Sequence, residues 1–272
     1  MTQLLQAQPD LGDQILAANR RRASRWRIEF LAVWLVILAG LIAFVLITIK
    51  LDAAFLTKVV PFIVGGVGVT LLISLSSIAL AIVLAALGAL GRLSRNPVAN
   101  GVASFYVSLV RGTPLLLQIL FIYLALPQAG LVLDAFVCGV IALGFNYGAY
   151  MTEIFRAGIQ AVPGGQAEAA DSLGMSGRTT FFRIIAPQAF RIVTPAIGND
   201  FIAMLKDSSL VSAIGVHEIL FNAQVAGRPT FQSMQTLIIA ALVYWVMTIT
   251  FSYFQNRLER RMATADRAKG AV

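Results

Sequence analysis

Charge is scarce in this sequence. Only 12% of the 272 residues are Asp, Glu, Lys or Arg, whereas 58% are hydrophobic, and the mean hydropathy is +0.80. A soluble domain of this length cannot bury so much apolar surface, which excludes an ordinary water-soluble globular protein. Lipid must therefore be the solvent for much of the chain, and the composition predicts a membrane protein.

Cysteine and histidine each occur once. The single cysteine, Cys138, excludes an internal disulfide and a cysteine-rich metal site, and we expect it to be a small apolar residue within a span. The lone His217 has no partner at metal-ligand spacing, which favours a surface residue at the outer interface over a ligand or a proton shuttle. We therefore expect no metal site.

Signatures of nucleotide and covalent chemistry are also missing. The sequence has no Gly-x-x-x-x-Gly-Lys-Ser/Thr phosphate loop, no nucleotide-binding Gly-x-Gly-x-x-Gly after a strand, and no serine, cysteine or metal constellation of an enzyme. We expect no catalytic residues and no cofactor in this chain. If the protein uses ATP, the hydrolytic site must belong to a separate subunit.

The net charge of +8 is open to a nucleic-acid interpretation, but the arginines and lysines lie between apolar runs, without an RNA-binding aromatic motif or a basic recognition helix. We expect no nucleic-acid partner, and we interpret the charge as a determinant of membrane orientation.

What the sequence does contain is six long apolar segments, each near the roughly 20 residues that cross a bilayer as a helix. An arginine cluster ending at Arg27 precedes the first segment. The segment is not followed by the small-residue cleavage site of a signal peptide, so we expect it to be a retained span. The third is interrupted by Arg111, Gly112 and Pro114, which predicts an interfacial helix up to Val110 and a short, kinked span after it. We expect Arg111 to be an interfacial anchor. The segments are Phe30–Ile49, Phe62–Leu90, Gly101–Leu126, Ala135–Ile154, Ile192–Ile214 and Met234–Phe254.

The distribution of basic residues predicts the orientation of these spans. If the amino terminus is cytoplasmic, 17 of the 21 Lys and Arg residues are inside, three are outside, and Lys206 lies within a span. Since basic residues accumulate on the cytoplasmic side, both termini and the polar loop between the fourth and fifth spans are predicted to be cytoplasmic.

That polar loop, from Glu168 to Pro187, is too charged for lipid and too patterned for a slack linker. Its first part predicts about two helical turns, with Glu168 and Asp171 near the start at the positive end of the helix dipole. Gly174 supplies the positive φ of a helix end, and a second short helix follows before Pro187 begins the next element.

Charged residues within the predicted spans should not face lipid, because each costs about 2.5 to 3.5 kcal/mol at a helix centre. Asp200 and Asp207 are two turns apart and share a face, with Lys206 on the adjacent one. Asn146, Tyr150 and Glu153 follow helical spacing in the fourth span. These six residues predict a hydrated path or pocket for a substrate. Equally, Lys206 can pair with Asp207 or Glu153, or snorkel, and Asn146 and Tyr150 can simply join helices.

The polar loop resembles the coupling loop of permease subunits from ATP-binding-cassette (ABC) importers. It has Glu168-Ala169-Ala170, then Gly174 after three residues, Ile184 after nine more, and Pro187; Ala186 stands where the pattern has leucine. Further runs resemble the polar amino acid branch of this family, and together they cover roughly residues 62–256. They are Arg111 to Leu116, Tyr147 to Ile159, Gly198 to Ile202 and Lys206 to Leu210.

The resemblance implies an all-α, polytopic membrane protein with a type I importer core of five helices, one additional N-terminal helix and a cytoplasmic coupling helix. The implied divisions are a cytoplasmic leader (1–28), an extra helix and external loop (29–61), the permease core (62–256) with its coupling loop (164–187), and a cytoplasmic tail (257–272).

The resemblance further implies two permease subunits, identical or homologous, in a bacterial inner membrane, two ATPase subunits that carry ATP and Mg²⁺, and an external solute-binding protein. The implied substrate is a polar amino acid, with glutamine, glutamate, histidine, arginine and cystine all open. The rival hypotheses are an ion-coupled secondary transporter with titrating Asp200 and Glu153, and a membrane scaffold that moves nothing.

Overall fold

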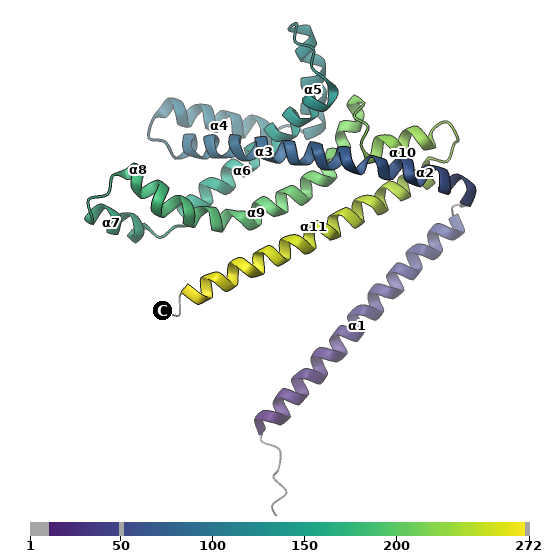
Figure 1. The fold of residues 1–272 in the computed structure, drawn as a ribbon, viewed down its shortest axis with the longest axis horizontal. Helices are drawn as coiled ribbons and strands as arrows, with labels where there is room; N and C mark the ends of the chain where they lie inside the picture. Colours follow the sequence, from purple (N-terminus) through teal and green to yellow (C-terminus); the bar gives the residue numbers. More distant parts are fainter. Residues whose placement is uncertain (1–10, 49–51, 270–272) are drawn as a thin grey trace, which may run out of the picture. The chain divides into compact units, whose positions relative to one another are not determined.

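A computed structural model describes residues 11–48 and 52–269 of the chain (Figure 1). Within these residues every regular element is helical, which confirms the all-α fold. The chain divides into two compact units, residues 1–53 and 54–272. Residues 1–10 of the predicted leader, the end of the first span at Ile49, the external Lys50 and the last three residues of the tail lie outside the described residues.

Among its described residues, the first unit has one long helix, α1 (Leu11–Thr48). Its membrane-compatible part is Ser24–Phe44. Trp26, Phe30 and Trp34 recur every four residues, and their rings contact each other at centroid distances of 5.2 and 6.0 Å. The predicted span is thus part of a helix that already begins in the leader and includes the arginine cluster.

The second unit opens with α2 (Ala53–Gly65) and α3 (Val67–Leu93), which are separated only at Gly66. A Cβ at Gly66 would lie 2.6 Å from the backbone nitrogen of Ile219, so glycine is required there for another segment to approach. The buried face of α3 carries Ala81, Ala85 and Ala89 at four-residue spacing, with at most 1% exposure. Small residues let another helix pack closely in lipid.

The central pair of the bundle is α3 with α6 (Ala135–Gln160), which pack more extensively than any other two described helices. Glycines make the close approach possible. A Cβ at Gly88 would lie 2.3 Å from Oγ1 of Thr152, and one at Gly144 would lie 2.7 Å from Cδ2 of Leu80. Asp134 begins α6 by accepting a hydrogen bond from the backbone of Phe136 at 2.8 Å.

The predicted interfacial helix is instead a member of the bundle. Helix α4 (Pro97–Arg111) packs against α3 and α6 and buries Ala103, Val107 and Val110. The break after Val110 suggested an interface, but the small and β-branched residues of this helix fit against two neighbouring helices. After the break at residues 112–114, α5 (Leu115–Gln128) turns by 106° relative to α4 (Figure 1).

The polar loop forms α7 (Gly164–Ser172) and α8 (Gly177–Thr180), and then a π-helical turn, η1 (Phe181–Ile185), leads into α9 (Ala186–Asp207). The helix, turn and second helix are as predicted. The second helix, however, runs through η1 into α9 instead of ending before it, and Pro187 is accommodated in the first turn of α9.

The fifth span ends in the 3₁₀ helix η2 (Ser208–Ile214), which stops at Gly215 with φ +87°. The short α10 (Ile219–Gly227) follows at a bend of 48°. The final helix, α11 (Ser233–Lys269), extends well beyond the predicted sixth span, and its membrane-compatible part is Ser233–Met262.

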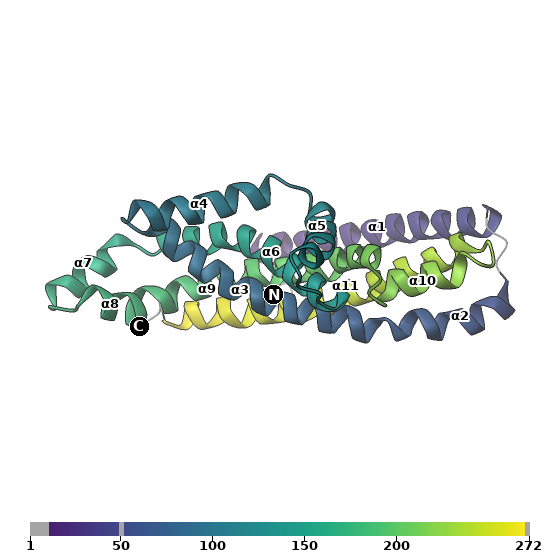
Figure 2. The same cartoon turned by 90° about the horizontal axis from the view of Figure 1, so that it is seen from above.

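In the part of the chain that the structure describes, four helices are long and apolar enough to cross a membrane. The number is six if each of two bent pairs, α4 with α5 and Gly177–Ile214 with α10, counts as one span. Figure 2 shows α3, α9 and α11 running along the same direction in the second unit, with α7 and α8 at one end.

Candidate functional site

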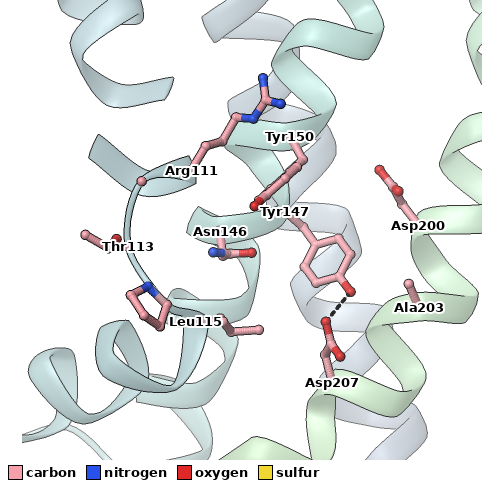
Figure 3. Close-up of a pocket in the computed structure, with 11 residues that line it drawn as sticks. Arg111, Thr113, Leu115, Asn146, Tyr147, Tyr150, Asp200, Ala203 and Asp207 are labelled. Atoms are coloured by element: carbon pink, nitrogen blue, oxygen red, sulfur yellow. Dashed lines mark hydrogen bonds between the residues drawn. The ribbon is translucent and has the colours of Figure 1, made fainter. Parts of the chain in front are cut away.

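A polar cavity of about 570 Å³ opens where the α4–α5 break meets α6 and α9 (Figure 3). Its size is in the range of small-molecule sites. It brings together four residues of the predicted path and several that the sequence did not single out for it. The lining residues are Arg111, Gly112, Thr113, Pro114, Leu115, Asn146, Tyr147, Tyr150, Asp200, Ala203 and Asp207.

The acidic side of the cavity belongs to α9. Asp200 and Asp207 both line it, as their two-turn spacing predicts. Asp207 is satisfied, since the hydroxyl of Tyr147 donates a hydrogen bond to its Oδ2 at 2.8 Å. By contrast, Oδ2 of Asp200 is buried and has no hydrogen-bond partner among the described residues. A buried carboxylate oxygen without a donor is costly, so Asp200 is the group most in need of one.

The basic side of the cavity is Arg111, at the end of α4. Its guanidinium carbon lies 5.1 Å from the ring centroid of Tyr150, within the range of a cation–π contact. We predicted an interfacial anchor from the position of Arg111 in the sequence, whereas the fold places its side chain at the cavity. The interruption of an apolar run by Arg111-Gly112-Thr113-Pro114 was the available signal, because a broken helix in a membrane exposes backbone that must line protein or water.

Gln118 holds this break in place. Its Nε2 donates to the carbonyls of Val110 and Thr113 at 2.8 and 3.1 Å and so links the residues of the break to α5. Its Oε1 accepts a hydrogen bond from Nδ2 of Asn146 at 3.1 Å. Asn146 thus joins α6 to α5 and also lines the cavity.

Glu153 and Lys206 do not line the cavity. Seven residues separate Glu153 from Asn146, which keeps them on one helical face but about 10 Å apart along α6, and so next to different neighbours. The Glu153 carboxylate pairs with Arg92 and Arg156 at 3.0 and 2.8 Å. Glu153 is therefore paired with two arginines and not with Lys206, a partner that the sequence allowed. The Lys206 side chain is exposed.

The coupling segment, defined as residues 164–187, presents a mixed surface. Glu168 and Ala169 of α7 are exposed, whereas Ala170 is buried inside the segment with 1% exposure. Gly174 has the predicted positive φ, +72°. Leu173, which the sequence did not single out, is 80% exposed although it is a large apolar residue.

The acidic residues of this segment are not at the start of its first helix. Because α7 begins at Gly164, after Pro163, its first turn contains no acidic residue, and Asp171 lies near its end. The expected interaction with the positive end of the dipole is therefore wrong, and Glu168 instead points an exposed carboxylate outward from the middle of α7. In the second half of the segment, Ile184 is partly buried and Pro187 is exposed.

A further buried acid, Glu218, lies outside the cavity at the bend before α10. Its carboxylate accepts hydrogen bonds from the backbone of Leu220 and Phe221 at 2.9 and 2.7 Å and from the hydroxyl of Tyr244. These donors satisfy a side chain with 0% exposure, so Glu218 fixes the bend. The neighbouring His217 is exposed and stacks on Phe221 at 4.4 Å.

An apolar helical bundle with a polar cavity between its helices and an exposed helical segment at one end is the arrangement expected of a membrane transport subunit. Residues 77–264 match the family described as binding-protein-dependent transport system inner membrane component. The chain belongs to this family, which consists of the permease subunits of ABC importers.

Two curated relatives come from Bacillus subtilis (strain 168). The L-cystine transport system permease protein TcyB is 40% identical over 203 residues, which cover 74% of this chain and 87% of TcyB. The arginine transport system permease protein ArtQ is 36% identical over 218 residues, which cover 80% of this chain and all of ArtQ.

Solved structures agree with this assignment. The crystal structure of an amino acid ABC transporter with histidines has a chain that is 40% identical, with a TM-score of 0.73, over 78% of this chain and 100% of that one. The inward-facing MetNI methionine ABC transporter shares the fold, with a TM-score of 0.63 at 16% identity, over 74% of this chain and 96% of that one.

Proposed function

We propose that this chain is the permease subunit of an ATP-driven importer that carries polar amino acids across a bacterial inner membrane. Its family membership establishes the permease role, and the names of its relatives support amino acids as substrates. The observation that carries the mechanism is the helical continuity from the exposed coupling segment, through η1, into α9, which holds both acidic residues of the cavity.

ATP hydrolysis takes place in separate ATPase subunits, because this chain lacks a phosphate loop. Two such subunits with bound ATP and Mg²⁺ dock on the coupling segments of two permease subunits, the second being an identical or homologous chain. A solute-binding protein delivers the amino acid from outside. The exposed Glu168 and Leu173 offer the ATPase a carboxylate acceptor and an apolar contact.

The amino acid passes through the cavity beside Arg111 and Asp200. An amino acid zwitterion carries one ammonium and one carboxylate group. The unpaired oxygen of Asp200 accepts a hydrogen bond from the ammonium, and the guanidinium of Arg111 binds the carboxylate. A transient pairing of this kind satisfies the buried oxygen without a permanent internal partner.

Nucleotide drives transport by changing the balance between inward-open and outward-open states. ATP closes the ATPase pair, which displaces the coupling segment and therefore α9. ATP can shift this equilibrium only as far as it binds the two states with different affinity. The coupling segment and both termini are on the cytoplasmic side, in agreement with the excess of basic residues in these regions.

Gentle purification followed by reconstitution tests this proposal. We expect a stoichiometric ATPase to co-purify with the chain, and we expect proteoliposomes that contain the complex and a solute-binding protein to accumulate a polar amino acid only with ATP. Uptake by the purified chain alone, driven by a proton gradient and indifferent to ATP, would refute the proposal and favour an ion-coupled carrier.

A further inference from the structure

Glu153 joins two arginines from different helices near the end of the bundle that carries the coupling segment. Its Oε1 accepts a hydrogen bond from Nε of Arg92, on α3, at 3.0 Å. Its Oε2 accepts one from Nε of Arg156, one turn further along α6, at 2.9 Å. The three side chains are only 21 to 30% exposed, so this is a partly buried network and not a pair of solvated surface charges.

Arg92 extends this network to α4. Its Nη1 donates a hydrogen bond to Oγ of Ser104, and Ser104 in turn donates to Oδ1 of Asn100 at 3.1 Å. Nδ2 of Asn100 donates a hydrogen bond to the backbone oxygen of Arg92 at 2.8 Å. These bonds close a polar ring across the turn between α3 and α4, so the hairpin formed by these two helices is fixed as one piece.

Arg156 extends the network in the opposite direction, toward the coupling segment. Its Nη1 donates to Oε1 of Gln160 at 2.7 Å, and Gln160 is the last residue of α6. Only three residues separate it from Gly164, where α7 begins. Figure 1 shows the α3–α4 turn and the coupling segment at the same end of the second unit.

We propose that Glu153 is a positioning residue that transmits movement of the coupling segment to the α3–α4 hairpin. This inference rests on the proposed function. Through η1, the far end of the coupling segment already moves α9. The network around Glu153 connects the other end of the coupling segment, next to α6, to α3 and α4. Helices on both sides of the cavity therefore respond to the ATPase.

The electrostatics of the network explain why the carboxylate is needed. With Glu153 ionised, one negative group lies between two guanidinium groups, and both are paired. Without its charge, two partly buried arginines face each other with no counter-ion, and the end of α6 separates from α3. A displacement of α7 would then be absorbed by the short link at residues 161–163.

The test uses the complete importer in proteoliposomes and measures ATP hydrolysed per amino acid imported. We expect Glu153→Gln and Arg92→Gln each to raise this ratio about tenfold, as expected for the loss of a typical coupling between sites. Arg95→Gln is the matched control, because Arg95 is exposed three residues away, outside the network, and should leave the ratio unchanged. The double variant should be no worse than either single variant, since the pair acts as one unit.

Each outcome is decisive. Unchanged ratios in Glu153→Gln and Arg92→Gln overturn the inference, whereas a wild-type complex that imports nothing with ATP contradicts the proposed function itself. If these variants fail to assemble, Arg92→Lys takes their place. Lysine keeps the positive charge but cannot reproduce the separate guanidinium hydrogen bonds to Glu153 and Ser104. An assembled Arg92→Lys complex with a raised ratio supports transmission, and its failure to assemble, or a normal ratio, overturns it.

Discussion

At the scale of single residues, the two acids of α9 differ in what surrounds them. Asp207 receives the Tyr147 hydroxyl, whereas Oδ2 of Asp200 is buried without a donor. The difference supports separate roles for the two acids, because a satisfied carboxylate orders its neighbours and an unsatisfied one is free to receive a ligand. Lys206, although it adjoins Asp207 in sequence, is exposed and outside the cavity.

Asp200→Asn should therefore raise the Michaelis constant for amino acid uptake by about tenfold or more, since a hydrogen bond to a charged group contributes about 1.5 to 3 kcal/mol. The ATPase should still co-purify in full, because Asp200 is remote from the coupling segment along α9. Lys206→Gln is the control on the same helix and should leave uptake within about twofold of wild type. Equal effects of the two substitutions would contradict a role for Asp200 in the cavity.

At the scale of helices, glycine decides how closely α3 and α6 pack. Oγ1 of Thr152 occupies the space that a Cβ at Gly88 would need, at 2.3 Å, and this threonine is buried and β-branched. The side chain cannot withdraw without leaving its rotamer, so the helices themselves would have to separate.

Gly88→Ala should lower the free energy of unfolding by about 1 to 3 kcal/mol through overpacking. The thermal midpoint of the detergent-purified chain should fall by about 2 to 4 °C for each kcal/mol. Gly101→Ala, on the exposed side of α4 with nothing within 4 Å of its Cβ, should not lower the midpoint. A midpoint for Gly88→Ala that matches wild type would mean that α3 and α6 are not in such close contact.

The coupling segment depends on a glycine for a different reason, its backbone conformation. Gly174→Ala should weaken ATPase binding about tenfold, because a side chain at φ +72° costs about 1 to 2 kcal/mol and tilts α7 away from α8. Gly165→Ala, within α7 and in open space, is the control and should bind normally. Titration of solubilised permease with purified ATPase measures both, and equal affinities would exclude the turn as a determinant of docking.

At the scale of the whole molecule, a polar segment at one end of the bundle is linked to the cavity by two separate routes. One is the helix that continues through η1 into α9, and the other is the Glu153 network at the end of α6. A push on the coupling segment therefore reaches helices on both sides of the cavity. This arrangement suits a subunit whose driving force is applied from outside the membrane.

Glu168→Lys should reduce ATPase binding at least about tenfold. The lysine would face the donor group of the ATPase that Glu168 is proposed to bind, and two like charges in an interface cost several kcal/mol. Glu29→Lys, an equal charge change at an exposed residue of α1, should leave the complex intact. Co-elution of the ATPase in size-exclusion chromatography checks both. Retention of the ATPase and full transport by Glu168→Lys would show that the segment docks elsewhere or not at all.

The sequence by itself determined the properties that depend on composition and near neighbours. Hydropathy identified lipid as the solvent, the two-turn spacing placed Asp200 and Asp207 on one face, and Gly174 marked the turn of the coupling segment. Each of these follows from helical periodicity or from the backbone freedom of one residue, and so requires no knowledge of distant contacts.

Only the tertiary structure decided which partners these residues have. Glu153 and Arg92 are 61 positions apart and Tyr147 and Asp207 are 60 apart, so no local pattern identifies either pair. Helical spacing assigned Glu153 to the same polar stripe as Asn146 and Tyr150. At the position of Glu153 along α6, however, the neighbouring helix is α3, and the side chain does not line the cavity. The break after α4 likewise moved Arg111 from an expected interface to the cavity. Local sequence fixes the face of its own helix on which a side chain lies. Which other helix that face contacts is set by the packing of the entire bundle.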